Sequence, residues 1–286
     1  MKIITDTASN ISFDAAKILN IHVVPFHIHF MDQTYLDGIT LTPDKLYQLY
    51  QDNPNEISKT SQPSVGDFAD IYNQYDEEIL SIHLSSGLSG AYSSAVNAAK
   101  LVDEKRITVI DTKTVGPALG WIVETAARGV QKKWSKERIL EAIEEVRKNT
   151  ITMVSFSDLK YLINSGRISH LQGIMASVLK IKPIIGMNES DGRYSNLGKE
   201  ITVQKTINKM STLVANRFGN VKIRIQLMHG NNLSKAADLQ KTMLSMIDGF
   251  ENKLMTITPV LGAHAGPTVI GVAAMPESVY ATYLTD

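Results

Sequence analysis

A loop of serines and glycines at residues 84–90 (LSSGLSG) follows a short apolar stretch and precedes a run rich in alanine. The apolar stretch 78–83 predicts a buried strand, and the run 92–101 predicts a helix. A glycine-bearing turn from strand to helix leaves backbone N–H groups free at the helix start, where an anion is stabilised. The serine hydroxyls both donate and accept hydrogen bonds. The loop therefore has the chemistry of a site for an oxygen-rich head group, although plain helix capping uses the same residue types.

Two acidic residues follow other predicted strands. Asp6 comes directly after the strand predicted at 2–5, and Asp111 follows the strand predicted at 107–110. Strands alternate with helices over the first ~150 residues, which predicts a mainly parallel sheet with helices on both faces. Ligands of such sheets lie beyond the carboxyl ends of the strands. We therefore expect Asp6, the 84–90 loop and Asp111 to meet at one edge of the sheet.

The character of the chain changes after residue 150, and the second half is predicted to be a further α/β region without any internal repeat. Strands are predicted at 153–155, 182–187, 221–228, 254–257 and 269–274, helices at 159–167, 202–217 and 233–247, a hairpin turn at 191–193 and a loop at 262–267. An apolar run covers 171–179. We predict an α/β fold of two α/β domains, residues 1–153 and 154–286, the first with a mainly parallel sheet.

Composition excludes several classes of protein. The chain has 286 residues, 43% of them hydrophobic, and Lys plus Arg (29) balance Asp plus Glu (29). No net field attracts nucleic acid or an anionic membrane, so neither is expected as a partner. There is no cysteine, which excludes disulfides, thiolate metal sites and a Cys nucleophile.

The location of the protein can be predicted from the same composition. The first residues, MKIITD, become polar too early for a secretory leader. No apolar run reaches the length of a membrane span, so stable membrane insertion is not expected. A cysteine-free chain of this kind suits the cytoplasm, and we expect a cytoplasmic protein.

A serine hydrolase is the main enzymatic alternative. Ser89, Asp111 and His264 follow one another in the chain order of the α/β-hydrolase triad. The nucleophile elbow G-x-S-x-G is not matched, because residues 87–91 read GLSGA. We keep an acyl hydrolase with Ser89 as nucleophile as the alternative, and otherwise assign no catalytic residue.

Motifs for nucleotides and metals are weak. Neither G-x-x-x-x-G-K-[ST] nor G-x-G-x-x-G follows a predicted strand. His27 and His29 share one face of a predicted strand, yet no third ligand stands at suitable spacing, so no metal site is expected. His264 lies between Gly262 and Gly266, where its ring is free to point into a cleft or to serve a structural role.

Six segments together resemble the DegV family. They occur in the family's order over essentially the whole chain: residues 5–8 (TDTA), 60–64 (TSQPS), 84–90 (LSSGLSG), 162–168, 179–184 and 262–266 (GAHAG). The TSQPS and LSSGLSG stretches are the most specific of these.

The resemblance implies both a ligand and a partner. Proteins of this family are two-domain α/β proteins that enclose a long-chain fatty acid, such as palmitate or stearate, in an apolar tunnel between the domains. The best understood members are the acyl-carrying subunit of a bacterial fatty acid kinase. They present the carboxylate to an ATP-dependent kinase subunit, which forms the acyl phosphate. No further cofactor is implied, and we expect a monomer.

The resemblance also implies site residues. Thr60 and Ser89 would hydrogen-bond the fatty acid carboxylate, with Ser61 and His264 beside it. A supporting set would comprise Ser86, Gly87, Gly90, Arg167 and Asp6, with Arg167 either stabilising the site or facing the kinase.

One departure from the family bears on the partner. Members usually have an Arg just before the long helix of the second half, where residues 197–202 of this chain read LGKEIT. Lys199 lacks the fork geometry of Arg, which puts kinase recognition in question and leaves lipid binding untouched. A third interpretation is a regulatory protein in which a permanently bound lipid only completes the core.

Overall fold

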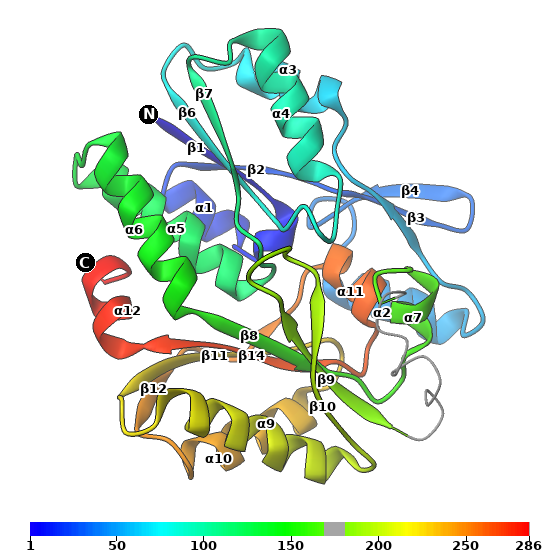
Figure 1. The fold of residues 1–286 in the computed structure, drawn as a ribbon. Helices are drawn as coiled ribbons and strands as arrows, with labels where there is room; N and C mark the ends of the chain where they lie inside the picture. Colours follow the sequence, from blue (N-terminus) through cyan, green and yellow to red (C-terminus); the bar gives the residue numbers. More distant parts are fainter. Residues whose placement is uncertain (169–180, 286) are drawn as a thin grey trace.

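The computed structural model describes residues 1–168 and 181–285. Its first sheet is parallel throughout and has the strand order β2–β1–β6–β7. These strands are β1 (Lys2–Asp6), β2 (Ile21–Val24), β6 (Ile79–His83) and β7 (Ile107–Asp111). The parallel sheet predicted from the alternation of strands and helices is confirmed. The carboxyl ends of β1, β6 and β7 meet at one edge, as the sequence predicted (Figure 1).

Helices cover both faces of this sheet. On one face, α3 (Val65–Tyr72) and α4 (Ala91–Val102) bury a cluster that includes Phe68 and Tyr72. On the other face lie α1 (Phe13–Ile18), α5 (Pro117–Gln131) and α6 (Lys136–Asn149). The apolar residues of α5 are buried along most of its length, because the helix packs against β1 on one side and against β14 of the second sheet on the other.

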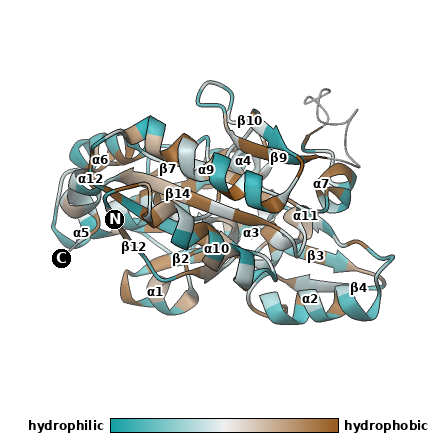
Figure 2. Ribbon diagram, turned by 90° about the horizontal axis from the view of Figure 1, so that it is seen from below, coloured by the Kyte–Doolittle hydropathy of each residue, from teal (hydrophilic) through white to brown (hydrophobic). Residues whose placement is uncertain are grey.

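The second sheet is mixed and largely antiparallel, with the order β10–β9–β8–β14–β11–β12 and β13 beside β11. Its strands are β8 (Ile151–Ser155), β9 (Lys182–Met187), β10 (Tyr194–Glu200), β11 (Ile223–His229), β12 (Gly249–Glu251), β13 (Met255–Thr256) and β14 (Ile270–Pro276). On its outer face, α9 (Val203–Phe218) and α10 (Leu233–Leu244) bury a separate core. Figure 2 shows hydrophobic residues along β9 and β14 and hydrophilic residues on the outer surfaces of the helices.

The two sheets thus form a layered molecule with α5 and α6 between them (Figure 1). The division into residues 1–153 and 154–286 stays a prediction. Strand β8 begins at Ile151 and pairs with β9 and β14, so a boundary after residue 153 would cut a strand of the second sheet. The last helix, α12 (Glu277–Tyr283), packs back on α5 and α6.

Short elements close one side of the space between the sheets. They are a 3-10 turn η1 (Thr7–Ser9), a small antiparallel sheet of β3 (His27–Phe30), β4 (Gln33–Leu36) and β5 (Lys59–Ser61), and the helices α2 (Pro43–Asp52), α7 (Lys160–Asn164) and α11 (Pro259–Ala265).

One predicted element was wrong. Residues 262–267 were expected to form a loop, but helix α11 runs through Ala265 and carries His264. Pro259 occupies the first turn, where its missing N–H costs nothing, and Gly266 ends the helix at φ 74°. Gly262 fits inside the helix because it packs directly on Tyr47, where a Cβ would lie 2.7 Å from the phenol oxygen. The apolar run predicted at 171–179 lies outside the described residues, as does the start of the 179–184 segment.

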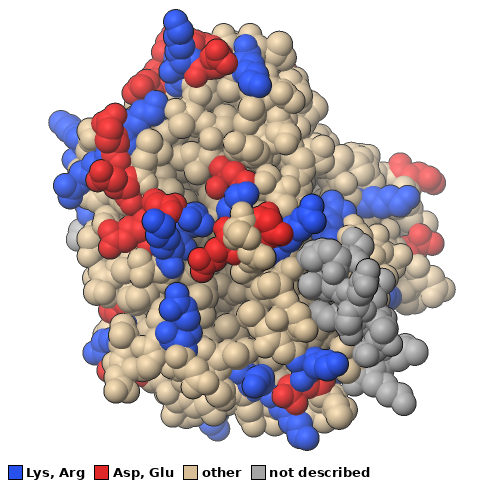
Figure 3. Space-filling view, in the orientation of Figure 1, with Lys and Arg blue, Asp and Glu red and all other residues tan. Residues whose placement is uncertain are grey.

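Within the described ranges, no helix combines the length and the apolar character that crossing a bilayer requires. Figure 3 shows basic and acidic side chains interspersed over one face of the molecule, as the balanced composition suggests.

Candidate functional site

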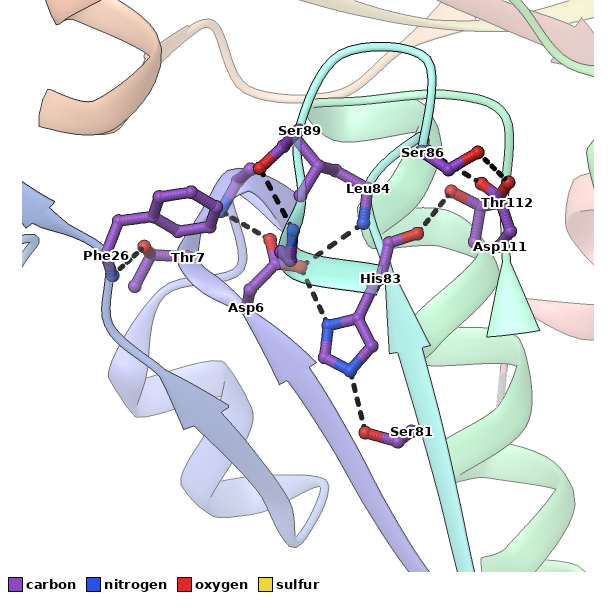
Figure 4. A network of polar contacts seen from close by, with 12 residues as sticks. Asp6, Thr7, Phe26, Ser81, His83, Leu84, Ser86, Ser89, Asp111 and Thr112 are labelled. Atoms are coloured by element: carbon purple, nitrogen blue, oxygen red, sulfur yellow. Dashed lines mark hydrogen bonds and ion pairs between the residues drawn. The ribbon is translucent and has the colours of Figure 1, made fainter. Parts of the chain in front are cut away.

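Asp6 organises the strand ends beneath the 84–90 loop. Its carboxylate accepts hydrogen bonds from the N–H of Ala8 (3.0 Å), the N–H of Leu84 (3.2 Å) and Nδ1 of His83 (2.9 Å) (Figure 4). His83 continues the network to Ser81 through Nε2 (2.7 Å). All of these groups are buried. Asp6 therefore holds the loop in place, and its carboxylate oxygens are occupied by hydrogen bonds within the protein.

Ser89 lies where the loop meets helix α4. Its Oγ accepts a hydrogen bond from the N–H of Ala91 (3.2 Å), and the N-cap residue Gly90 provides no side-chain cap. Ser89 thus caps helix α4, which is the structural role that the sequence analysis weighed for the serines of this loop. The same side chain lines the cavity between the two sheets, and its own O–H proton remains available to donate to a ligand.

Thr60 and His264 form the second polar group of the cavity. Thr60 lies on β5 and His264 on α11, and Thr60 Oγ1 is 2.8 Å from His264 Nε2. When Nε2 carries the ring proton, it donates to Thr60, and the threonine O–H is free to donate to a bound acceptor. These residues stand 204 positions apart in the chain, so only the tertiary fold brings them together.

His264 is neutral at physiological pH. Burial of the imidazole lowers its pKa to about 3, and the positive charge of Arg167 lowers it further. A neutral imidazole orients the threonine hydroxyl without placing a formal charge in the apolar cavity.

Arg167 supplies the cation at this end of the cavity. Its guanidinium donates to the carbonyl of Ser165 and forms no ion pair within the described part of the chain. Burial raises the pKa of Tyr194 to about 12, and Arg167 opposes that rise, so the tyrosine on the same wall stays a neutral phenol. The polar end therefore offers hydroxyl donors, a neutral imidazole and the positive charge of Arg167, which suits an anionic head group.

The cavity between the sheets is otherwise apolar. It spans about 950 Å³ of space not occupied by atoms, and part of this space is open solvent. The residues from the end of the first sheet and from the second sheet that line its body include Leu84, Val115, Phe156, Ile185, Met228 and Val269. We call this space the inter-sheet cavity.

The other predicted residues lie around the cavity, and several point elsewhere. Ser61 follows Thr60 on β5 and faces the opposite side, where its Oγ contacts Nε2 of His29 at 2.9 Å. Ser86 donates through its N–H (3.0 Å) and its hydroxyl to Asp111 (Figure 4). Ser61, Ser86 and Asp6 are absent from the residues that line the inter-sheet cavity.

Gly87 and Gly90 serve close packing. A Cβ on Gly90 would lie 3.1 Å from the amide of Gln62, a cavity residue. A Cβ on Gly87 would lie 2.6 Å from the carbonyl oxygen of Asp191, in the turn that joins β9 to β10. Ser85 donates to the carbonyl of Gly192 in the same turn (2.6 Å). The turn between β9 and β10 thus packs closely against the 84–90 loop.

This close packing makes Gly192 sensitive to substitution. Gly192 has φ +66°, and an added Cβ would lie 2.0 Å from Ser85 Oγ. We expect Gly192→Ala to lower the free energy of unfolding by about 2–4 kcal/mol, from strain at positive φ and overpacking. Gly166→Ala is the matched control, because Gly166 also has positive φ (+73°) but nothing within 4 Å of the added Cβ. It should cost only about 1 kcal/mol. An equal loss of unfolding free energy in urea titrations of both variants would contradict close packing between Gly192 and Ser85.

The described residues Ser89, Asp111 and His264 do not form the catalytic triad that the hydrolase alternative requires. Asp111 accepts hydrogen bonds from Ser86 and from the N–H of Lys113 and pairs with the Lys113 ammonium (3.2 Å). His264 Nε2 contacts Thr60. Neither contact builds a relay from Asp111 through His264 to Ser89, and the serine hydrolase is unsupported. Among the described residues no group of three potential ligands is arranged to hold a metal ion.

Sequence reasoning missed several residues of the cavity. Gln62 and Tyr194 line it, although Gln62 was noted only as part of the TSQPS segment. Tyr194 directly follows the predicted hairpin turn, and alternation along β10 offered no sign that its ring would face a cavity. The apolar lining was missed as a group, because core residues and cavity residues share the same pattern.

The family model "Uncharacterised protein, DegV family COG1307" matches residues 1–277. This chain belongs to the DegV family. A DegV domain-containing protein of Staphylococcus aureus is 31% identical over 279 residues, which cover 96% of this chain and 98% of that protein. A DegV domain-containing protein of Clostridium acetobutylicum is 28% identical with the same coverage. The resemblance inferred from the six segments is confirmed.

Solved DegV structures share the fold. DegV from Bacillus subtilis, described as a fatty acid binding protein, has a TM-score of 0.84 at 27% identity, over 96% of this chain and 98% of that one. A DegV family protein from Thermus thermophilus, described by its fatty acid binding, has a TM-score of 0.84 at 26% identity, over 96% and 99%. A stearic acid-binding protein from Eubacterium ventriosum has a TM-score of 0.85 at 24% identity, over 98% and 99%, and supports the fold alone.

Proposed function

We propose that this protein binds a long-chain fatty acid in the inter-sheet cavity and presents the carboxylate to an ATP-dependent fatty acid kinase. The observation that carries the proposal is the composition of the cavity: an apolar body with Thr60, Ser89, His264 and Arg167 at one end. The DegV proteins of Bacillus subtilis and Thermus thermophilus, both described as binding fatty acids, support the choice of ligand.

The ligand's two parts have different roles in this account. Burial of each methylene contributes ~0.8 kcal/mol, so a C16 tail contributes roughly 11 kcal/mol before the cost of association. The tail supplies most of the affinity. The Ser89 and Thr60 hydroxyls would then fix where the carboxylate stops, through charge-assisted hydrogen bonds. Arg167 compensates the charge that the carboxylate brings.

The site is built for binding more than for chemistry. A bound carboxylate would meet neutral donors and the Arg167 cation, and among residues 1–168 and 181–285 no general base is paired with Ser89. An acyl phosphate would therefore be formed by a partner that supplies ATP. The cytoplasm, where ATP and acyl groups are available, is the compartment that fits this role.

The presentation step is tested with the lipid-loaded protein, a bacterial fatty acid kinase subunit and ATP. Acyl phosphate is trapped with hydroxylamine and measured as the hydroxamate. Formation that depends on both proteins, and that falls in Thr60→Ala but not in Ser61→Ala, supports presentation. Stoichiometric bound lipid without turnover would favour the regulatory interpretation, in which lipid only completes the core.

A further inference from the structure

The inter-sheet cavity adjoins a second pocket that is open to solvent. Leu88, Ser89 and Arg167 line both spaces. The other residues that line the second pocket are Ser86, Gly87, Gly90, Ser165, Gly166 and Arg193. None of the residues named above for the apolar body of the cavity is among them. Because Ser89 and Arg167 belong to the proposed head-group site, this pocket continues from the place where the carboxylate would stop. We call it the outer pocket.

The outer pocket has the composition of an anion site. Among the described residues that line it, Leu88 alone has an apolar side chain. Two arginines line it from separate segments of the chain: Arg167 follows helix α7, and Arg193 directly precedes β10. Arg167 is half-buried and Arg193 is exposed. Over residues 1–168 and 181–285 neither guanidinium forms an ion pair, so both positive charges are available to a ligand.

Tertiary contacts hold the backbone of Arg193 next to the 84–90 loop. The carbonyl of Gly192 accepts the hydrogen bond from the Ser85 hydroxyl (2.6 Å), and the carbonyl of Arg193 accepts one from the N–H of Asn188 (2.8 Å). The N–H of Arg193 donates to the carboxylate of Asp191 (2.9 Å). The fold therefore places a cation here by packing and does not depend on the reach of a flexible surface loop.

Nearby carboxylates do not cancel this charge inside the pocket. Asp191 and Asp111 are the acidic residues in contact with its walls, and neither lines it. Asp111 accepts from the Ser86 hydroxyl and pairs with the Lys113 ammonium at 3.2 Å. The outer pocket thus keeps a net positive character beside the head-group site.

Phosphorylation of a bound fatty acid would add a group that needs such a pocket. The transfer forms a bond between one carboxylate oxygen and the γ-phosphorus of ATP, and it breaks the bond from that phosphorus to ADP. The head group then ends in a phosphoryl group with roughly two negative charges and three strong acceptor oxygens. The planar fork of an arginine binds two such oxygens at once.

We propose that the outer pocket is a phosphoryl subsite, in which Arg193 together with Arg167 binds the phosphoryl group of a long-chain acyl phosphate. This inference rests on the proposed function. A fatty acid would end at Ser89 and Arg167 and would not reach Arg193. Arg193 therefore distinguishes the acyl phosphate from the acid and holds the product on the protein after transfer.

The test is a pair of titrations of delipidated protein, with palmitate and with 2-oxoheptadecylphosphonate. In this phosphonate a CH₂ group replaces the bridging oxygen of palmitoyl phosphate, so the probe does not hydrolyse. Arg193→Gln should weaken phosphonate binding at least tenfold, the effect of one charge-assisted contact, and leave palmitate affinity within about twofold. Arg193→Lys should restore part of the loss, because Lys keeps the charge and lacks the fork.

Lys59→Gln is the matched control. Lys59 is an exposed cation that lines a different pocket beside Arg167, and its removal should change neither affinity. The inference is overturned if Arg193→Gln weakens both ligands by one common factor or changes neither. It is also overturned if Lys59→Gln causes the loss instead, or if wild type binds palmitate and refuses the phosphonate. If wild type binds neither ligand, the proposed function itself has failed.

Discussion

Thr60→Ala should weaken fatty acid binding by about 10- to 100-fold, and adding Ser89→Ala should weaken it further. Thr60 Oγ1 stands 2.8 Å from His264 Nε2, and the hydroxyls of Thr60 and Ser89 both line the inter-sheet cavity, each beside Arg167. Each hydrogen bond to a carboxylate contributes about 1.5–3 kcal/mol, which sets the expected range. Titration of delipidated protein with palmitate measures the change.

Ser61→Ala is the matched control for this effect. It removes the same kind of hydroxyl one residue along β5, where the side chain faces His29 and not the cavity. Its affinity for palmitate should stay within about twofold of wild type. Equal losses in Thr60→Ala and Ser61→Ala would mean that β5 was merely disturbed and that Thr60 does not contact the ligand.

The second large effect concerns the stability of the fold and its pH dependence. Asp37 is fully buried after β4, and its Oδ1 accepts a hydrogen bond from the N–H of Val260 (3.2 Å) in helix α11, which carries His264. Burial raises the pKa of Asp37 from 3.8 to about 7, and the nearby negative charge of Asp6 adds to this, while hydrogen bonds from Thr7 and Val260 oppose it.

The sign of the effect follows from the raised pKa. Between pH 4 and 7 the folded protein binds a proton at Asp37 that the unfolded chain has released. Stability from this group is therefore fully present below pH 4 and is lost as the pH rises to 7. The difference between the two pKa values corresponds to about 4 kcal/mol as an upper bound. The free energy of unfolding of Asp37→Asn should rise relative to wild type by up to this amount from pH 4 to pH 8.

Urea titrations at pH 4, 6 and 8 measure the difference. Asp32→Asn, which removes an exposed carboxyl from the turn between β3 and β4, controls for the change in net charge. Parallel pH profiles for wild type and Asp37→Asn would show that the carboxyl of Asp37 ionises alike in the folded and unfolded chains.

The parts of the fold that depend on local pattern could be predicted from the sequence. The first sheet follows from short apolar strands that alternate with capped helices, and the edge where Asp6, the 84–90 loop and Asp111 meet follows from parallel strand order. Helix α11 was missed because glycines at 262 and 266 suggest a loop when the packing of Gly262 on Tyr47 is unknown.

Long-range pairings could not be derived in this way. The contact between Thr60 and His264 joins two short elements 204 residues apart, and the sequence pattern of neither segment indicates this contact. The resemblance to the DegV family implied both residues, but it also implied Ser61. Because side chains alternate along β5, the Ser61 side chain points toward His29 and away from the cavity. The role of Asp37 depends entirely on its burial, which a single acidic residue in a sequence does not reveal.

The most direct test of the central claim is native mass spectrometry, with organic extraction, of protein purified from bacteria without added lipid. We expect one C16 to C18 fatty acid per chain, retained in Ser61→Ala and lost or much reduced in Thr60→Ala plus Ser89→Ala. Protein that is folded but carries no acid, and that takes up none when palmitate is added, would contradict fatty acid binding.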